Sequence, residues 1–97
     1  MEFDSWQMHE IRLGLEAYVD VALYADPKFD WMQMYQIRKG LEAGINASIY
    51  ADTKFDECQM EEIRYGLESD IDVSSFTDPK YDSFDMREIR LVLESRL

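Results

Sequence analysis

The sequence predicts an all-α protein, built as a short α-solenoid of tandem 26-residue repeats. Three observations support this prediction. A long motif recurs at a fixed period without gaps, each copy opens with a helix-capping pattern, and the apolar residues inside each copy follow helical spacing. Each complete repeat is expected to hold one long helix and one shorter helix, which gives about seven helices in all.

The repeat boundaries follow from aligning the copies. The units are 3–28, 29–54, 55–80 and a partial unit, 81–97, so that residues 1–97 form a single repeat domain. The first unit reads FDSWQMHEIRLGLEAYVDVALYADPK, whereas the fourth, YDSFDMREIRLVLESRL, stops before the second half of the motif. Because a short repeat cannot bury its apolar face alone, most recurring residues are expected to form the scaffold.

The start of each unit carries the signals of a long helix. Asp4 is an N-cap candidate, and Gln7, three residues later, would complete a capping box. Met8, Ile11 and Leu15 then follow the spacing of a buried helical stripe. The equivalent capping pairs are Asp30–Gln33, Asp56–Gln59 and Asp82–Asp85, and the equivalent apolar residues are Met34, Ile37, Leu41, Met60, Ile63, Leu67, Met86, Ile89 and Leu93.

The second half of each unit predicts a turn and a shorter helix. Gly44 stands where a left-handed residue would end the long helix, while Tyr18 and Asp70 occupy that position in the other complete units. The N-cap candidates of the shorter helix are Asp20, Asn46 and Asp72. Pro27 and Pro79 would end it.

A glycine recurs in the middle of the long helix, at Gly14, Gly40 and Gly66. Glycine costs about 1 kcal/mol relative to alanine at such a position, so its recurrence indicates a steric need. We expect an adjacent helix to approach closely there. Val92 takes this place in the partial unit, which fits either a terminal helix with nothing stacked beyond it or a side chain that fills the space of the missing short helix.

Composition excludes some classes of protein. The formal net charge of −11 argues against a general binder of nucleic acid or of anionic membranes, although acidity of this size also serves solubility alone. The third unit carries eight acidic residues against Arg64 and Lys80, which predicts an acidic patch. One cysteine, Cys58, leaves no intrachain disulfide. The chain has no long apolar run and no secretory leader, so a cytoplasmic location is expected.

The positions that differ most between units are four residues apart on the long helix, opposite the apolar stripe. We predict a partner-binding face there, and the alternatives are drift on a solvated face and packing of Trp31 onto its own array. The neighbouring position stays apolar and is expected to be half-buried against the next unit; it holds Trp6, Met32, Cys58 and Phe84. The predicted partner-binding residues are Leu13, Trp31, Tyr35, Lys39, Tyr65 and Leu91.

Residue patterns typical of enzymes are missing. His9 is the single histidine, and it lies on the predicted outer face. The sequence contains no zinc spacing, phosphate loop or dinucleotide motif. We therefore predict a non-enzymatic protein-interaction module without catalytic residues, cofactors or bound metal. The alternative is an acidic mimic of nucleic acid that inhibits a DNA-binding enzyme, although the second unit, with no net charge, would interrupt its rows of carboxylates.

The expected partner is another protein or a second copy of the chain, not a nucleic acid or a membrane. The first unit offers Trp6, Leu13, Tyr18 and Leu23 with few charges between them. Such an apolar end can be covered by a second copy, so a homodimer is possible. The net charge would oppose it, most strongly at low salt.

The motifs FDxxQMxEIRxGLE and DVSxYADPK resemble tandem helical repeats in uncharacterised proteins of anaerobic gut bacteria, some of them linked to mobile genetic elements. The resemblance covers residues 3–97. It implies a repeat architecture but no activity, and it transfers no functional residue. The units depart from the pattern at Tyr18, Asp70 and Val92.

Overall fold

The computed structural model describes residues 2–97, and this part of the chain is all-helical. It measures 42 × 26 × 15 Å along its principal axes, which is an elongated and thin shape. The elements in order are α1 (Ser5–Glu16), η1 (Val21–Leu23), α2 (Trp31–Glu42), η2 (Ala47–Ile49), α3 (Glu57–Glu68) and α4 (Ser83–Glu94), where η marks a 3₁₀-helix.

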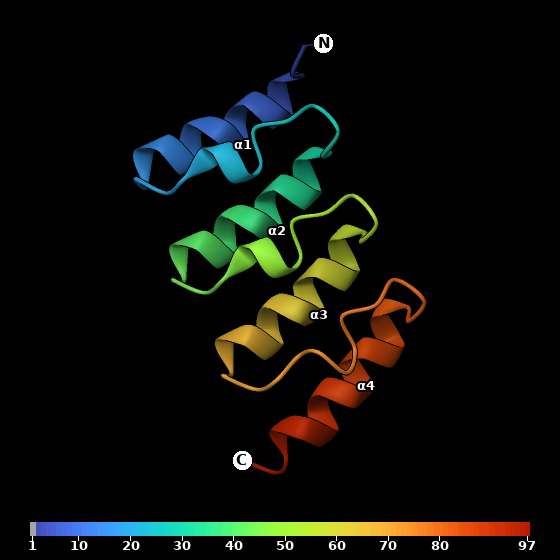
Figure 1. Cartoon of the computed structure of the whole chain (residues 1–97). Coiled ribbons are helices and arrows are strands. Elements are labelled where there is room, and N and C mark those ends of the chain that lie inside the picture. The colour runs from blue at the N-terminus through green and yellow to red at the C-terminus, as the bar shows by residue number, and fades with distance from the viewer. Residues whose placement is uncertain (1) are drawn as a thin grey trace.

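The four α-helices lie side by side in chain order and run in the same direction (Figure 1). Each packs against the next, and the segment between two α-helices returns along the first of them before the next begins. The two termini therefore lie at opposite ends of the molecule (Figure 1).

The N-terminus of each α-helix is capped by aspartate, as the sequence predicts. In α1, Asp4 accepts a 2.8 Å hydrogen bond from the backbone N–H of Gln7, and the Gln7 side chain accepts one from the backbone N–H of Asp4. The same capping box is present at the start of α2 and of α3. The predicted box at α4 is wrong: Asp82 accepts from the N–H of Asp85, but Asp85 has a shorter side chain than glutamine and does not complete the reciprocal bond.

Each capping glutamine also joins two units. The side-chain amide of Gln7 donates a 2.7 Å hydrogen bond to the carbonyl of Phe29, which lies just before α2. Gln33 and Gln59 make the same bond to the carbonyls of Phe55 and Tyr81. The same glutamine thus caps the start of its own helix and fixes the next helix beside it. Asp85, which has no amide to donate, cannot do this.

A left-handed residue follows α1, α2 and α3, at Gly44 as predicted and also at Tyr18 and Asp70, where the repeat has no glycine. Gly44 has φ 76°, and Tyr18 and Asp70 both have φ 60°. The residue after each donates its N–H to the carbonyl of the mid-helix glycine, as from Val19 to Gly14 at 3.1 Å. This bond satisfies a carbonyl at the helix end. Tyr18 and Asp70 take a backbone conformation that is unfavourable for a residue with a side chain.

The prediction of about seven helices is wrong. Residues 2–97 contain four α-helices and two 3₁₀-helices of three residues, and the second half of the third unit is a turn. In η1 the N–H of Leu23 bonds to the Asp20 carbonyl at 3.3 Å, and η2 has the equivalent bond. In the third unit, Phe76 still bonds to Val73, but the described hydrogen bonds include none from Ser75 to Asp72.

The core is a row of buried aromatic and aliphatic side chains between the α-helices and the returning segments. Tyr24 lies over α1 and donates a 2.7 Å hydrogen bond from its hydroxyl to the carbonyl of Glu10, and Tyr50 does the same to Gln36. The large fully buried residues are Tyr24, Phe29, Met34, Ile37, Tyr50, Phe55, Met60, Ile63, Phe76 and Met86.

Residues of the second half of each unit explain the recurring glycine. A Cβ on Gly14 or Gly40 would collide with the hydroxyl of Tyr24 or Tyr50, and one on Gly66 would lie 2.8 Å from Val73 and 3.1 Å from Phe76. In the first two units the contacts include Val21 of η1 and Ala47 of η2, so the adjacent helix that approaches is the short helix of the same unit.

The methionine and isoleucine of the predicted apolar stripe are buried in α2 and α3 and the leucine is half-buried, whereas no residue of the stripe is fully buried in α1. Met34 and Met60 are fully buried, whereas Met8 is 53% exposed and Leu15 is 58% exposed. The difference arises because the side of α1 that carries Met8 and Leu15 has no preceding unit against it within residues 2–97.

Candidate functional site

The exposed apolar side chains of the α-helices form the candidate site. Trp6 is 62% exposed and Phe84 is 66% exposed, both in the first turn of their helices, and Met32 and Cys58 at the same position are also exposed. The expectation that this position is half-buried against the next unit is therefore wrong. We name as the outer strip the exposed residues Trp6, Trp31, Met32, Phe84 and Leu91.

The position of these residues on the helix explains their exposure. Residues seven apart complete two helical turns and lie on one side of a helix. Phe84 and Leu91 are such a pair, and Leu91 belongs to the predicted partner-binding face. The first-turn apolar position therefore continues that face. The seven-residue spacing from Phe84 to Leu91 in the sequence could have shown that the first-turn position lies on the exposed face. The position was expected to be half-buried because every unit has an apolar residue there.

The two tryptophans of the chain are stacked on each other. The rings of Trp6 and Trp31 lie with their centroids 5.4 Å apart and their planes 30° from parallel. Trp31 thus packs on its own array, which was one of the alternatives, and it remains 37% exposed. The pair joins α1 and α2 across the outer strip and offers a rigid aromatic surface of the kind that is enriched in protein interfaces.

Two of the predicted partner-binding residues also serve the scaffold. Tyr35 and Tyr65 are half-buried. The guanidinium of Arg38 lies 5.3 Å from the ring centre of Tyr35, and Tyr65 lies beside both Arg64, at 4.9 Å, and Arg90, at 5.3 Å. Leu13 and Lys39 are also half-buried, while Leu91 is 43% exposed. The exposed members of the predicted face are therefore Trp31 on α2 and Leu91 on α4.

Arginine residues link successive units next to this face. Nε of Arg38 donates a 2.8 Å hydrogen bond to the carboxylate of Glu10 in the preceding unit, and Nε of Arg90 donates a 3.1 Å hydrogen bond to Glu62. Both arginines also bond to a glutamate one turn later in their own helix, Glu42 or Glu94. Burial lowers the pKa of Arg38, but its bonds to Glu10 and Glu42 raise it by more, so the guanidinium stays charged.

Arg64 makes the same contact with a neutral acceptor. Nε of Arg64 donates a 2.9 Å hydrogen bond to the side-chain oxygen of Gln36, and Nη1 of Arg64 donates one to Glu68. Arg38, Arg64 and Arg90 each bond to an acceptor in the preceding unit, whereas Arg12 contacts Glu16 and His9 within its own helix.

Cys58 lies in the exposed first turn of α3 but is not an activated thiol. Partial burial raises its pKa, and the nearby carboxylates of Glu57 and Asp56 raise it further. A thiol with a raised pKa holds little of the nucleophilic thiolate at neutral pH.

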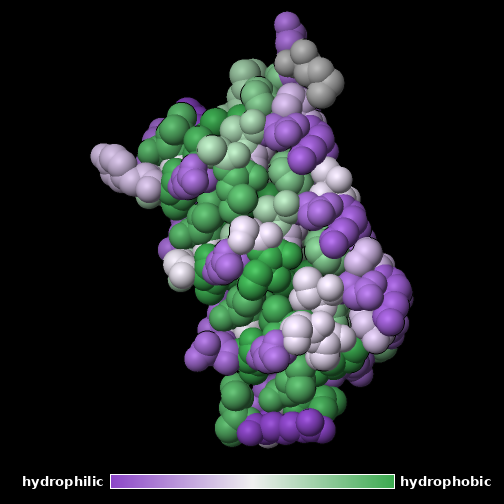
Figure 2. Space-filling view, in the orientation of Figure 1, coloured by the Kyte–Doolittle hydropathy of each residue, from purple (hydrophilic) through white to green (hydrophobic). Residues whose placement is uncertain are grey.

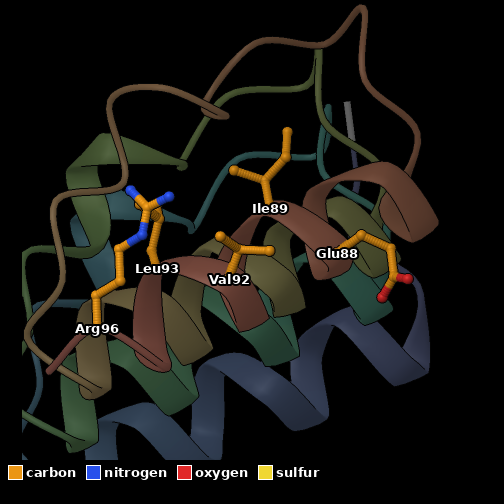
Figure 3. Close-up of a pocket in the computed structure, with 5 residues that line it drawn as sticks. All are labelled: Glu88, Ile89, Val92, Leu93 and Arg96. Atoms are coloured by element: carbon orange, nitrogen blue, oxygen red, sulfur yellow. The ribbon is translucent and has the colours of Figure 1, made fainter.

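A pocket of about 350 Å³ lies on α4 (Figure 3). Val92, which lines the pocket, occupies the position in the fourth unit that Gly14 occupies in the first. On α1 the surface around Gly14 is covered by Tyr24 and Val21 of the same unit. The pocket is thus the part of α4 that a second half-unit covers in the other units. Its lining residues are Glu88, Ile89, Val92, Leu93 and Arg96.

The view in Figure 2 shows how polar and apolar residues are distributed on one side of the molecule. Hydrophilic residues follow the edge on which the turns between units lie, and apolar residues gather over the helical layer (Figure 2). Within residues 2–97, no three His, Cys, Asp or Glu side chains are arranged to hold a metal ion. No helix of the described chain is long and apolar enough to cross a membrane.

Comparison with models of protein families, with curated proteins and with solved structures finds no match to this chain.

Proposed function

We propose that this protein is a non-enzymatic protein-interaction module that binds another protein through the outer strip. The observation that carries the proposal is the exposed Trp6–Trp31 stack, which continues into exposed Met32 on α2. A stacked tryptophan pair loses little conformational freedom when a partner covers it, and tryptophan is prominent among residues that dominate binding energy. Its partial exposure leaves apolar surface for a partner to bury.

We further propose that the scaffold is a short α-solenoid forming one domain over residues 1–97. Three equivalent contacts support this part of the proposal. Three features recur between successive α-helices: a hydrogen bond from glutamine to a backbone carbonyl, a hydrogen bond from arginine to glutamate or glutamine, and a buried methionine. A solenoid displays one side of each unit in a continuous row, which fits a binding face that changes from unit to unit.

The acidic mimic of nucleic acid remains the second hypothesis, and no specific contact favours it. Several carboxylates are already paired inside the scaffold, because Glu10, Glu62 and Glu94 accept hydrogen bonds from arginine. A mimic needs carboxylates that are free to face a basic partner. The absence of catalysis, the lack of a cofactor and the cytoplasmic location likewise remain proposals.

Affinity capture from a lysate of the source organism tests the proposed face. The wild-type protein is compared with Trp6→Ser/Trp31→Ser, and the control is Tyr18→Asn, which removes an aromatic side chain that is 96% exposed at the far end of α1. Asparagine tolerates the left-handed backbone of that position. Circular dichroism establishes that each variant is folded.

We expect the wild type and Tyr18→Asn to retain the same protein and the double variant to lose it. Retention should change little with salt, because the contact is apolar. If the double variant retains the same protein as the wild type, the face is wrongly assigned. Capture of a DNA-binding enzyme that is released by moderate salt would favour the mimic instead.

A further inference from the structure

The two ends of the helical row expose the two halves of one interface. On α1, the side that carries Met8, Arg12 and Leu15 is open within residues 2–97, although the equivalent residues of α2 and α3 are covered by the preceding unit. The equivalent residues of α2 differ in burial from those of α1: Met34 and Arg38 are buried and Leu41 is half-buried.

On α4, the opposite side is open. Glu88 is exposed, whereas its equivalents Glu10, Gln36 and Glu62 are buried beneath the arginine of the following unit. Glu88 also lines the pocket on α4, next to the apolar side chains of Ile89, Val92 and Leu93 (Figure 3). This end of the row therefore offers a carboxylate beside an apolar recess.

Arg12 already has the arrangement that the internal arginines have. It bonds to Glu16 one turn later through Nη1, at 3.1 Å, as Arg38 bonds to Glu42 and Arg64 bonds to Glu68. The internal arginines use Nε for the acceptor of the preceding unit. Among the contacts of residues 2–97, Nε of Arg12 has no such acceptor.

We propose that a second copy of this chain docks head-to-tail, with α1 of one copy against α4 of the other. Arg12 of one copy bonds to Glu88 of the next, in the register of the Arg38–Glu10 contact, and Met8 and Leu15 become buried against the open side of α4. The opposite charges of Arg12 and Glu88, which stand at the positions of the internal pair Arg38 and Glu10, identify the occupant. Glu88 lies within one helical turn of Phe84 and Leu91, so this surface adjoins one end of the outer strip. The inference rests on Arg12 and Glu88 and not on the Trp6–Trp31 stack, so it does not depend on the proposed function.

The proposed contact between copies joins the open side of α1 to the open side of α4, which are two different surfaces of the chain. A copy that docks through α1 leaves its own α4 open, so association continues as a chain of copies, not as a two-fold dimer. The junction differs from the internal contacts in two ways. No second half-unit covers α4 within residues 2–97, and Asp85 cannot donate to a carbonyl as Gln7 does. The association is therefore weaker than the internal contacts and depends on protein concentration.

Charge reversal on both sides of the junction tests the proposal by sedimentation velocity over a concentration series. Arg12→Glu and Glu88→Arg should each weaken self-association by about tenfold or more, because each places like charges at the junction. Mixing the two variants should restore assembly: every junction in an alternating chain then pairs opposite charges. Restoration also shows that both variants are folded.

Arg87→Glu is the matched control, since it changes the net charge as much as Arg12→Glu does but alters an exposed residue on the outer side of α4. It should assemble like the wild type. A wild-type chain that stays monomeric over the whole series overturns the proposal. So does an equal mixture of Arg12→Glu and Glu88→Arg that associates no better than either variant alone.

Discussion

Nε of Arg38 donates a 2.8 Å hydrogen bond to Glu10, a residue of the preceding unit, and both side chains are nearly inaccessible to solvent. Gln36 accepts the equivalent bond from Arg64 at 2.9 Å. The structure therefore contains the same contact with a charged acceptor and with a neutral one. What the contact requires is a buried acceptor for Nε, since an unpaired buried guanidinium is costly.

Replacement of Glu10 should reveal this requirement. Glu10→Gln should lower the free energy of unfolding by less than about 1 kcal/mol, because the Gln36–Arg64 pair shows that an amide oxygen suffices. Glu10→Leu should lower it by about 3 kcal/mol, because Arg38 loses its buried acceptor. Urea denaturation measures both. Equal losses in the two variants would mean that the charge, not the acceptor, stabilises the contact.

The glycine of each long helix makes room for an aromatic side chain. Gly40→Ala should destabilise the protein by about 1–3 kcal/mol, because the new Cβ meets the Tyr50 hydroxyl. Tyr50→Phe removes that hydroxyl and, with it, the bond to the Gln36 carbonyl.

A double-mutant cycle separates the two effects. The loss in Gly40→Ala/Tyr50→Phe should be smaller than the sum of the two single losses, since the shared clash is gone. Thermal denaturation of the four proteins provides the cycle. Strictly additive losses would show that the alanine acts through the helix alone.

Tyr18 offers a way to stabilise the protein. Its backbone is left-handed, with φ 60°, and its side chain is 96% exposed. Tyr18→Gly should raise the free energy of unfolding by about 1 kcal/mol, because it relieves an unfavourable conformation and removes little packing. Gly44→Ala, at the equivalent position of the second unit, should lower it by a similar amount. If Tyr18→Gly proves less stable than the parent, Tyr18 contributes packing that its exposure conceals.

Stability should fall at alkaline pH through the buried tyrosines. Burial raises the pKa of Tyr24 to about 12, with Glu10 contributing and Arg38 opposing. An unfolded tyrosine has a pKa of about 10. The folded state thus favours the protonated phenol, and this contribution is complete below about pH 10 and is lost as pH rises through about 12.

Urea denaturation at several pH values between 9 and 12 measures this dependence. The Tyr24→Phe variant is the comparison, because it lacks the ionisable group but keeps the ring. Its free energy of unfolding should fall less steeply over the same range. Parallel curves for the two proteins would show that Tyr24 is not the group responsible.

Sequence and structure agree where a local pattern decides the outcome. The aspartate caps and the left-handed Gly44 depend on neighbouring residues alone, and they were predictable. The left-handed backbone at Tyr18 and Asp70 was not predicted, because neither residue is a glycine. Burial depends on which units lie on either side. Met8 and Met34 have the same local sequence role but opposite exposure, and the repeat motif alone does not distinguish them.

The candidate site was predictable in part for the same reason. Trp31 and Leu91 are exposed, as a partner-binding face requires. Tyr35 and Tyr65 were chosen as variable aromatic residues, and their packing against arginines became visible only when the arginines of neighbouring units were in place. Trp6 was assigned to a half-buried position because an apolar residue always stands there, although neighbouring long helices do not cover it.

The most direct measurement of the proposed binding face is hydroxyl-radical footprinting of this protein with its captured partner, at a concentration where the chain alone is monomeric. Trp6, Trp31 and Met32 are exposed and react readily, and Tyr18 serves as an exposed reference away from the outer strip. The account predicts that the partner protects Trp6, Trp31 and Met32 and leaves Tyr18 as reactive as in the free protein. Protection of Tyr18 with unchanged oxidation of the two tryptophans would contradict it.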